Sequence, residues 1–257
     1  MAVVIEGLSY AYQDASVLHD INLDIAEGRF TIILGKNGSG KSTLLKLVAG
    51  MLKPQRGTIA IMGQEVGSLS MGERARLVGY LPQFHQPVFP FTVEEVVLTG
   101  RASYVFSIPS PRDREKARRA IAQVGIEELR TRPYTDLSGG ERQLVMIARV
   151  LAQEPRIILL DEPISHLDLA NQARFLKLVQ SLVKSGLTVL AVLHDPNPAF
   201  LYGEEFVFLK DGSARKSIHA DQAWDPSLLS QIYGIGIEVS RVRDRVFVTP
   251  CPEETAG

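Results

Sequence analysis

The sequence has very little cysteine and no excess of charge of either sign. Cys251 is the only cysteine among 257 residues, so no disulfide can form within the chain, which is typical of a reducing compartment. Lys and Arg total 28 against 29 Asp and Glu, and the formal net charge is −1. This balance argues against a nucleic-acid partner, because such proteins carry basic patches that neutralise phosphates. A content of 45% hydrophobic residues excludes a disordered chain.

Long apolar runs are also missing. A helix that crosses a membrane needs about 18 consecutive apolar residues, and the longest runs here, such as residues 189–193, are far shorter. The N-terminal Met-Ala-Val-Val-Ile-Glu has no basic segment before an apolar stretch, as a secretory signal peptide would have. We therefore expect a cytoplasmic chain that does not cross a membrane by itself.

Short apolar runs alternate with helical patterns along most of the chain. Strand-like runs occupy residues 3–8, 18–25, 30–34, 58–62, 78–82, 157–160 and 187–193. Residues 92–153 lack such runs and carry helical patterns instead, which predicts an inserted helical subdomain. Asp211-Gly212 is a turn signal that predicts antiparallel strands near the C-terminus. The fold class predicted from this alternation is α/β with a largely parallel sheet.

A glycine-rich loop follows the third apolar run and opens a helical pattern. It matches the phosphate-binding pattern G-x-x-x-x-G-K-[ST] in the strand–loop–helix context that this pattern requires. Backbone N–H groups of such a loop surround the phosphates of a nucleotide, while Lys41 supplies positive charge and Ser42 is a ligand for Mg²⁺. The residues of the loop are Gly35, Lys36, Asn37, Gly38, Ser39, Gly40, Lys41, Ser42 and Thr43.

Two carboxylates end the apolar run at residues 157–160. Asp161 and Glu162 would lie at the carboxyl edge of a parallel sheet, where open α/β sheets bind ligands. Neighbouring side chains at a strand end point in different directions. Asp161 is thus a candidate Mg²⁺ ligand, directly or through water, and Glu162 a candidate for polarising the water that attacks a phosphate.

The segment Leu-Ser-Gly-Gly-Glu-Arg-Gln at residues 137–143 precedes an amphipathic helix. Ser138, Gly139 and Gly140 open that helix, so its N-terminal amides form a second candidate anion site. A serine N-cap followed by two glycines is the alternative interpretation. With this segment the chain resembles the ATP-binding subunits of ABC transporters, whose signature sequence reads much like it.

The resemblance covers nearly the whole chain and implies a P-loop NTPase (RecA-like) core with an N-terminal antiparallel β subdomain and an inserted α-helical subdomain. It places the ATP-binding domain at residues 1–237, the helical subdomain at about 85–153 and a C-terminal extension at 238–257. Tyr12 resembles the aromatic residue that stacks on adenine, Gln83 the Q-loop residue and Mg²⁺ ligand, Asp168 the D-loop residue and His194 the switch histidine. Glu162, His194 and Gln83 are the implied catalytic residues. Ile164 departs from the family, which usually has Thr there.

The resemblance also implies cofactors, partners and a location. ATP and Mg²⁺ are the implied cofactors, and two copies would meet head to tail so that Lys41 of one subunit and Ser138 of the other enclose each ATP. Integral-membrane permease subunits would dock between the Gln83 loop and the helical subdomain. A periplasmic or extracellular substrate-binding protein would be an indirect partner. The chain would then lie on the cytoplasmic face of the cell (inner) membrane as a peripheral protein, with no nucleic-acid partner.

Three stretches favour one branch of the family. Residues 92–101, 193–197 and 228–239 resemble importers of metal chelates such as iron-siderophores, haem and cobalamin. Residues 168–172 also resemble molybdate or tungstate importers, which remain an alternative. A soluble ABC-type ATPase acting on nucleic acid or the ribosome is a more remote alternative, because the chain has one cassette and no long coiled coil between the motifs. Exporters are disfavoured because many fuse their membrane segment to the same chain.

Overall fold

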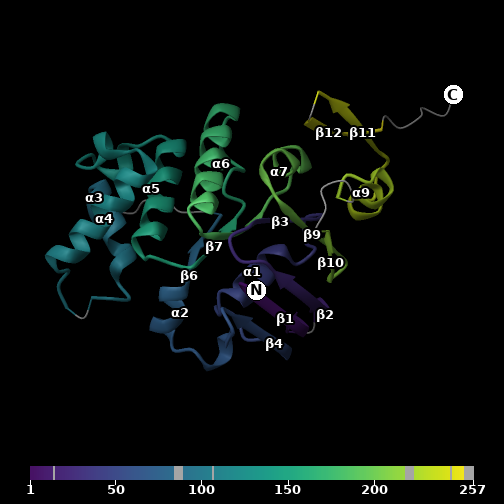
Figure 1. Ribbon diagram of the computed structural model, residues 1–257, viewed down its shortest axis with the longest axis horizontal. Helices are drawn as coiled ribbons and strands as arrows, with labels where there is room; N and C mark the ends of the chain where they lie inside the picture. The colour runs from purple at the N-terminus through teal and green to yellow at the C-terminus, as the bar shows by residue number, and fades with distance from the viewer. Residues whose placement is uncertain (14, 84–88, 106, 218–222, 244, 252–257) are drawn as a thin grey trace.

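The central element of the computed structural model is a six-stranded sheet in the order β10-β9-β3-β8-β7-β6 (Figure 1). The structure describes residues 1–257 except 14, 84–88, 106, 218–222, 244 and 252–257. Strand β3 pairs in parallel with β8 and β9, and β7 pairs in parallel with β6 and β8. Strands β9 and β10 form the antiparallel hairpin predicted at Asp211-Gly212. The strands are β3 Phe30–Leu34, β6 Val78–Leu81, β7 Ile157–Asp161, β8 Thr188–Val192, β9 Glu205–Lys210 and β10 Ser213–Ser217.

A second, antiparallel sheet in the order β2-β1-β4-β5 lies beside the first. One hydrophobic core joins this sheet to helix α1 and to one face of the central sheet, which supplies Ile33 and Leu159. Ile32 and Leu160 point to the opposite face, as the two-residue period of strands requires. The elements are β1 Val3–Tyr12, β2 Ala15–Ile25, β4 Arg56–Ile61, β5 Gln64–Glu65, α1 Lys41–Val48, the 3₁₀ turn η1 Val66–Ser68 and α2 Met71–Leu77.

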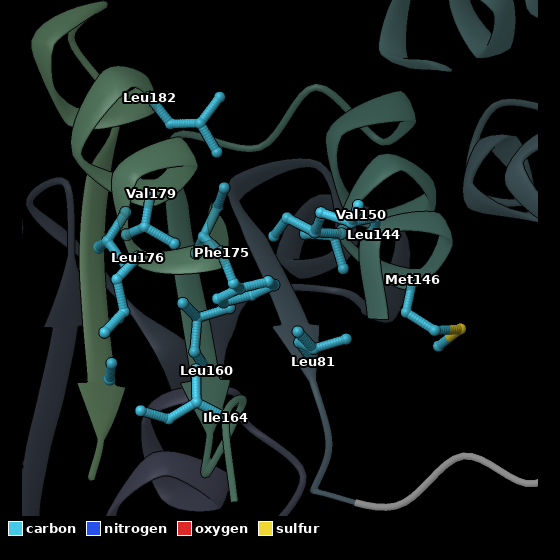
Figure 2. Close-up of a cluster of buried hydrophobic side chains, with 14 of the residues drawn as sticks. Leu81, Leu144, Met146, Val150, Leu160, Ile164, Phe175, Leu176, Val179 and Leu182 are labelled. Carbon is cyan, nitrogen blue, oxygen red and sulfur yellow. The ribbon is translucent and has the colours of Figure 1, made fainter. Parts of the chain in front are cut away.

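The opposite face of the central sheet packs against α6, Leu169–Lys184. Phe175, Leu176 and Val179 of this helix lie beside Leu160 of β7 (Figure 2). Ile164, the residue that departs from the family pattern, is 6% exposed and belongs to the same core. The departure from the usual Thr therefore places an apolar side chain in this core.

Helices α3, α4 and α5 form the inserted helical subdomain, on the side of β6 in Figure 1. The helices are α3 Val93–Leu98, α4 Pro111–Val124 and α5 Gly139–Ala152, with the 3₁₀ turns η2 Thr99–Arg101, η3 Glu127–Leu129 and η4 Tyr134–Asp136. The subdomain's predicted start at residue 85 lies outside the described residues. Its helical character agrees with the absence of strand-like runs in this part of the sequence.

The C-terminal part adds two helices and a hairpin to the edge of the fold near β9. Its elements are α7 Pro196–Tyr202, α9 Pro226–Tyr233, β11 Ile237–Val242 and β12 Arg245–Pro250, with β11 and β12 antiparallel. The predicted boundary at residue 238 falls within β11, and Ile237 and Val248 are buried in the main core. None of the described helices combines the length and the hydropathy that crossing a membrane requires.

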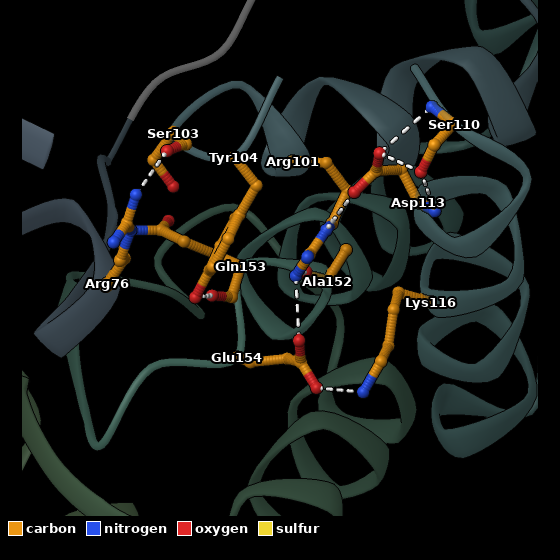
Figure 3. Close-up of polar contacts among 10 residues, drawn as sticks. All are labelled: Arg76, Arg101, Ser103, Tyr104, Ser110, Asp113, Lys116, Ala152, Gln153 and Glu154. Atoms are coloured by element: carbon orange, nitrogen blue, oxygen red, sulfur yellow. Dashed lines mark hydrogen bonds and ion pairs between the residues drawn. The ribbon is translucent and has the colours of Figure 1, made fainter. Parts of the chain in front are cut away.

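A buried arginine links the elements of the helical subdomain (Figure 3). Arg101 is 4% exposed, and its Nε lies 3.1 Å from Asp113 Oδ1 of α4. Its Nη1 donates to Glu154 Oε2 at 2.8 Å and to the Ala152 carbonyl at 2.9 Å. The guanidinium carbon lies 3.8 Å from the ring centre of Tyr104, a cation–π distance. These contacts supply the partners that a buried charge requires.

We expect Arg101→Ala to lower the free energy of unfolding by about 2–3 kcal/mol, because it removes a buried side chain and its hydrogen bonds to Asp113, Glu154 and the Ala152 carbonyl. Arg119→Ala in α4 is the control, since Arg119 pairs with Glu115 at the exposed surface. The control is expected to cost less than about 1 kcal/mol. Urea unfolding of both variants measures the difference, and equal losses would contradict the role assigned to Arg101.

Candidate functional site

The glycine loop of residues 35–43 connects β3 to α1 and is packed tightly on both sides. A Cβ atom at Gly35 would lie 2.1 Å from the Leu209 carbonyl oxygen of β9, and one at Gly40 would lie 2.7 Å from Leu18 Cδ2 of β2. Gly40 also has a φ of 98° at the N-cap of α1. These positions require glycine for packing. They leave the first amides of α1 without a capping side chain, the arrangement that binds phosphate at a helix N-terminus.

Lys41 is held inside this loop. Its Nζ donates to the Gly35 carbonyl at 2.8 Å and to the Lys36 carbonyl at 2.7 Å, and the residue is 5% exposed. Burial lowers the pKa of Lys41, and the nearby carboxylates of Glu162 and Asp161 act in the opposite direction. The ammonium group is thus positioned by the loop itself, so a bound phosphate does not have to order it.

Asp161, the last residue of β7, receives one hydrogen bond on each carboxylate oxygen. Ser42 Oγ donates to Oδ1 at 2.7 Å, and the Tyr80 hydroxyl donates to Oδ2 at 2.9 Å. Burial, and then the charge of Asp161, raise the pKa of Tyr80, so the phenol stays a donor. The sequence analysis did not find Tyr80, although it lies in the same Tyr-Leu-Pro-Gln segment as Gln83. The sequence signal that could have identified Tyr80 is its position on β6, the strand that pairs with β7.

Glu162 lies one residue beyond β7 and its carboxylate is held from two sides. Gln83 Nε2 donates to Oε2 at 2.5 Å, and His194 Nε2 lies 2.5 Å from Oε1. The backbone of Glu162 has a φ of 50°, an uncommon conformation for a residue other than glycine that is found at functional sites. The structure therefore brings the three predicted catalytic residues together, each from the end of a different strand of the central sheet.

One cavity of 420 Å³ joins the glycine loop to Glu162. Tyr12 lines this cavity, is 43% exposed and packs edge-to-face on Tyr10 with ring centres 4.9 Å apart. An exposed aromatic face at a phosphate-binding loop is suited to stacking on a flat base. The lining residues are Tyr12, Val17, Asn37, Gly38, Gly40, Lys41, Ser42, Thr43, Gln83, Glu162 and His194.

The polar groups of this cavity and its loop fit a nucleoside triphosphate with a magnesium ion. Among the described residues, Ser39 Oγ of the glycine loop is buried and lacks a hydrogen-bond partner, so an added acceptor would satisfy it. Ser42 and Asp161 offer the oxygen ligands that Mg²⁺ prefers. The part of the chain that the structure describes holds no group of three His, Cys, Asp or Glu side chains arranged for a metal. A magnesium ion held by Ser42 and Asp161 would share its remaining coordination positions with phosphate oxygens and water, as it does in nucleotide sites.

Ser138, Gly139 and Gly140, at the N-terminus of α5, do not line this cavity. Ser138 is the N-cap, and its Oγ accepts from the Glu141 amide at 3.3 Å while Glu141 Oε2 accepts from the Ser138 amide at 2.8 Å. Within one chain, Ser138 therefore acts as the helix N-cap, which was the alternative interpretation of this segment. Gly139 lines a second cavity, of 160 Å³, together with Gln83 and Glu162.

Asp168 caps helix α6 and orients a residue that the sequence analysis missed. Its Oδ1 accepts from the Asn171 amide at 2.8 Å and its Oδ2 from Asn171 Nδ2 at 3.0 Å. The Asn171 side chain then lies against Gly140, where a Cβ atom would be 2.6 Å from Asn171 Cγ. This contact joins the predicted D-loop residue to the glycines of residues 138–140 within the same chain.

Comparison with known proteins assigns the chain to a family. Residues 18–165, more than half of the sequence, match the family model described as ABC transporter. The chain belongs to the ABC transporter family. The membership confirms the predicted P-loop NTPase core with its added β and helical subdomains, and it confirms that this is an ATP-binding ATPase cassette.

Relatives and solved structures of ABC proteins match most of the length of this chain. The hemin import ATP-binding protein of Pseudomonas putida is 38% identical over 246 residues, which are 94% of this chain and 96% of the relative. An inward-facing metal-chelate type ABC transporter superimposes with a TM-score of 0.86 at 30% identity, covering 98% of both chains. The dimeric structure of a bacterial ABC transporter cassette gives a TM-score of 0.73 at 30% identity, covering 84% of this chain and 98% of that one.

Proposed function

We propose that this chain hydrolyses ATP at the cytoplasmic face of the cell membrane, as a peripheral subunit that powers a metal-chelate importer. The observation that carries the catalytic part is the Glu162 carboxylate, held between Gln83 and His194 at one end of the cavity that contains Lys41. A carboxylate fixed beyond the phosphate-binding loop is suited to polarise a water for attack on the γ-phosphate.

Each residue of the site takes a role that its position supports. Lys41 and the amides of the loop hold the phosphates, and Tyr12 stacks on the adenine. His194 and Gln83 orient Glu162 and the water. Ser42, Asp161 and Gln83 are the proposed Mg²⁺ ligands, Asp161 directly or through water, and the ion would neutralise charge that develops on the phosphates. Tyr80 adds a second hydrogen bond that fixes Asp161.

A second copy of the chain would complete the site. Ser138, Gly139 and Gly140 do not line the 420 Å³ cavity, yet they open a 14-residue helix whose N-terminal amides favour an anion. In a head-to-tail dimer these residues of one subunit would face the ATP held by Lys41 of the other, giving two composite sites related by a two-fold axis. The dimeric cassette structure among the neighbours supports this arrangement.

Mixing two defective variants tests the dimer. Lys41→Ala removes the charge of one half-site, and Ser138→Arg blocks the other half-site. Each homodimer then has a defect in both composite sites, whereas a mixed dimer has one doubly defective and one intact site. We expect single-turnover ATP hydrolysis to reappear in the mixture and to be missing from each parent. A mixture as inactive as its parents would contradict the shared site.

The surface next to the site offers a place for a permease. A groove of 750 Å³ lies between the core and the helical subdomain. Met51 and Met71 on the core side are 57% and 79% exposed, and Arg149 and Gln153 line the helical side. Adaptable methionine side chains at a surface are suited to contact with another protein. Tyr80 also lines this groove, so a partner seated there would lie close to Asp161.

The proposed cargo is a metal chelate, such as an iron-siderophore, haem or cobalamin. The hemin import relative and the metal-chelate transporter structure support this class. Residues 168–172 keep a molybdate or tungstate importer as the second candidate. The cargo would contact the permease and, outside the membrane, a substrate-binding protein, so this chain selects the cargo only through its partners.

Uptake into vesicles tests the cargo class. The chain is purified with the membrane protein that accompanies it, and the complex is reconstituted in vesicles with the binding protein. We expect ATP-dependent uptake of a ferric siderophore, hemin or cobalamin, with no uptake of molybdate or tungstate. The matched control is the same complex with Lys41→Ala, in which all uptake should stop. Uptake of the oxyanions alone would reverse the assignment.

A further inference from the structure

The loop that carries His194 is attached to the C-terminal segment by a tyrosine. Residues 194–197 lead from β8 into α7, and Tyr233, the last residue of α9, donates from its hydroxyl to the His194 carbonyl at 3.4 Å. Burial, and then the charge of Asp195, raise the pKa of Tyr233. The hydroxyl therefore keeps its proton and remains a donor to this carbonyl.

Asn197 attaches the same loop to β12. Its Nδ2 donates to the Val248 carbonyl at 3.2 Å, and its Oδ1 accepts from the Val248 amide at 2.8 Å. The side-chain amide thus bonds both main-chain groups of one residue, as a neighbouring strand would. Val248 is 7% exposed and belongs to the main core, so the attachment point is firmly packed.

Helix α9 also meets the glycine loop. Gly234 ends the helix with a φ of 65°, and a Cβ atom there would lie 2.4 Å from Lys36 Nζ. A positive side chain at the C-terminus of a helix is favourable because of the helix dipole. The C-terminal end of α9 therefore contacts both the phosphate-binding loop, through Lys36, and the loop of His194, through Tyr233.

We propose that Tyr233 and Asn197 are positioning residues, which hold the main chain of residues 194–197 so that the His194 ring reaches Glu162. The proposal rests on the proposed function, in which Glu162 and His194 act in hydrolysis. The His194 side chain is 38% exposed, so the surrounding side chains cover it incompletely and its place depends on the backbone that carries it. A misplacement of about 1 Å at a reacting group can cost up to about 100-fold in rate.

The C-terminal segment that holds residues 194–197 is itself anchored in the main core. Leu229 and Ile232 of α9 are buried in the main core, and Ile237 of β11 joins them. The Ile237 amide also donates to Ser230 Oγ at 3.0 Å, which ties the hairpin to the helix. Tyr233 and Asn197 thus connect the His194 loop to a segment that is packed into the main core and lies outside the phosphate-binding motifs.

The test compares Tyr233→Phe and Asn197→Ala with two matched controls. Tyr202→Phe makes the same change at the end of α7, and Gln180→Ala removes a side chain that donates to the Tyr202 carbonyl at 3.0 Å. Measurements are ATP affinity, single-turnover hydrolysis at saturating ATP and Mg²⁺, the midpoint of thermal unfolding, and the ¹⁵N signals of the histidine rings. His194→Ala identifies the His194 signal and gives the rate expected when the ring is lost.

We expect hydrolysis to fall about 3-fold in Tyr233→Phe, which loses one hydrogen bond, and about 10-fold in Asn197→Ala, which loses two, because the effects of separate hydrogen bonds multiply in the rate. The affinity for ATP should stay within about 2-fold of the wild type, because the phosphate contacts are unchanged. The His194 ring signal should move in both variants. The two controls should keep the wild-type rate and the wild-type His194 signal.

Lower thermal stability with a wild-type hydrolysis rate and an unmoved His194 signal would overturn the proposal and leave the C-terminal segment a purely structural role. If Asn197→Ala does not fold, Tyr233→Phe decides the question, because that change removes one oxygen atom. A wild-type rate in His194→Ala would instead contradict the proposed function of His194. The two failures are therefore distinguishable.

Discussion

The arrangement of the site depends on the two contacts of the Glu162 carboxylate, with Gln83 and with His194. This carboxylate joins Gln83, which follows β6, to His194, which follows β8, at the end of β7. These three strands are neighbours in a parallel sheet, so their carboxyl ends meet at one edge and chain segments far apart in sequence become adjacent. The left-handed backbone of Glu162 turns its side chain away from that of Asp161, which faces Ser42. Two successive carboxylates thereby take different partners.

The stretch at residues 92–101, which marks the importer branch by resemblance, has a packing role in the structure. It forms α3 and η2, where a Cβ atom at Gly100 would lie 2.0 Å from the Arg149 carbonyl oxygen of α5. Arg101 then enters the buried network with Asp113 and Glu154. A branch-specific sequence can therefore reflect how the helical subdomain is held together.

Much of the fold was predictable because its signals are local. Buried parallel strands are short apolar runs, and the Asp211-Gly212 hairpin and the glycine loop are contiguous patterns. Helix α2 was missed because none of its residues is buried, so it shows no apolar stripe. Tyr80 and Tyr233 were missed for another reason. Their partners Asp161 and His194 lie 81 and 39 residues away in sequence, and no local pattern reports such a contact.

The most direct test of the central claim separates ATP binding from ATP hydrolysis. If Glu162 acts on the water and Lys41 on the phosphates, Glu162→Gln should bind ATP with wild-type affinity and hydrolyse it at least about 100-fold more slowly, the loss expected without a general base. Lys41→Ala should weaken equilibrium binding of ATP itself. Binding and hydrolysis measured on both variants decide the matter, and wild-type turnover in Glu162→Gln would contradict the account.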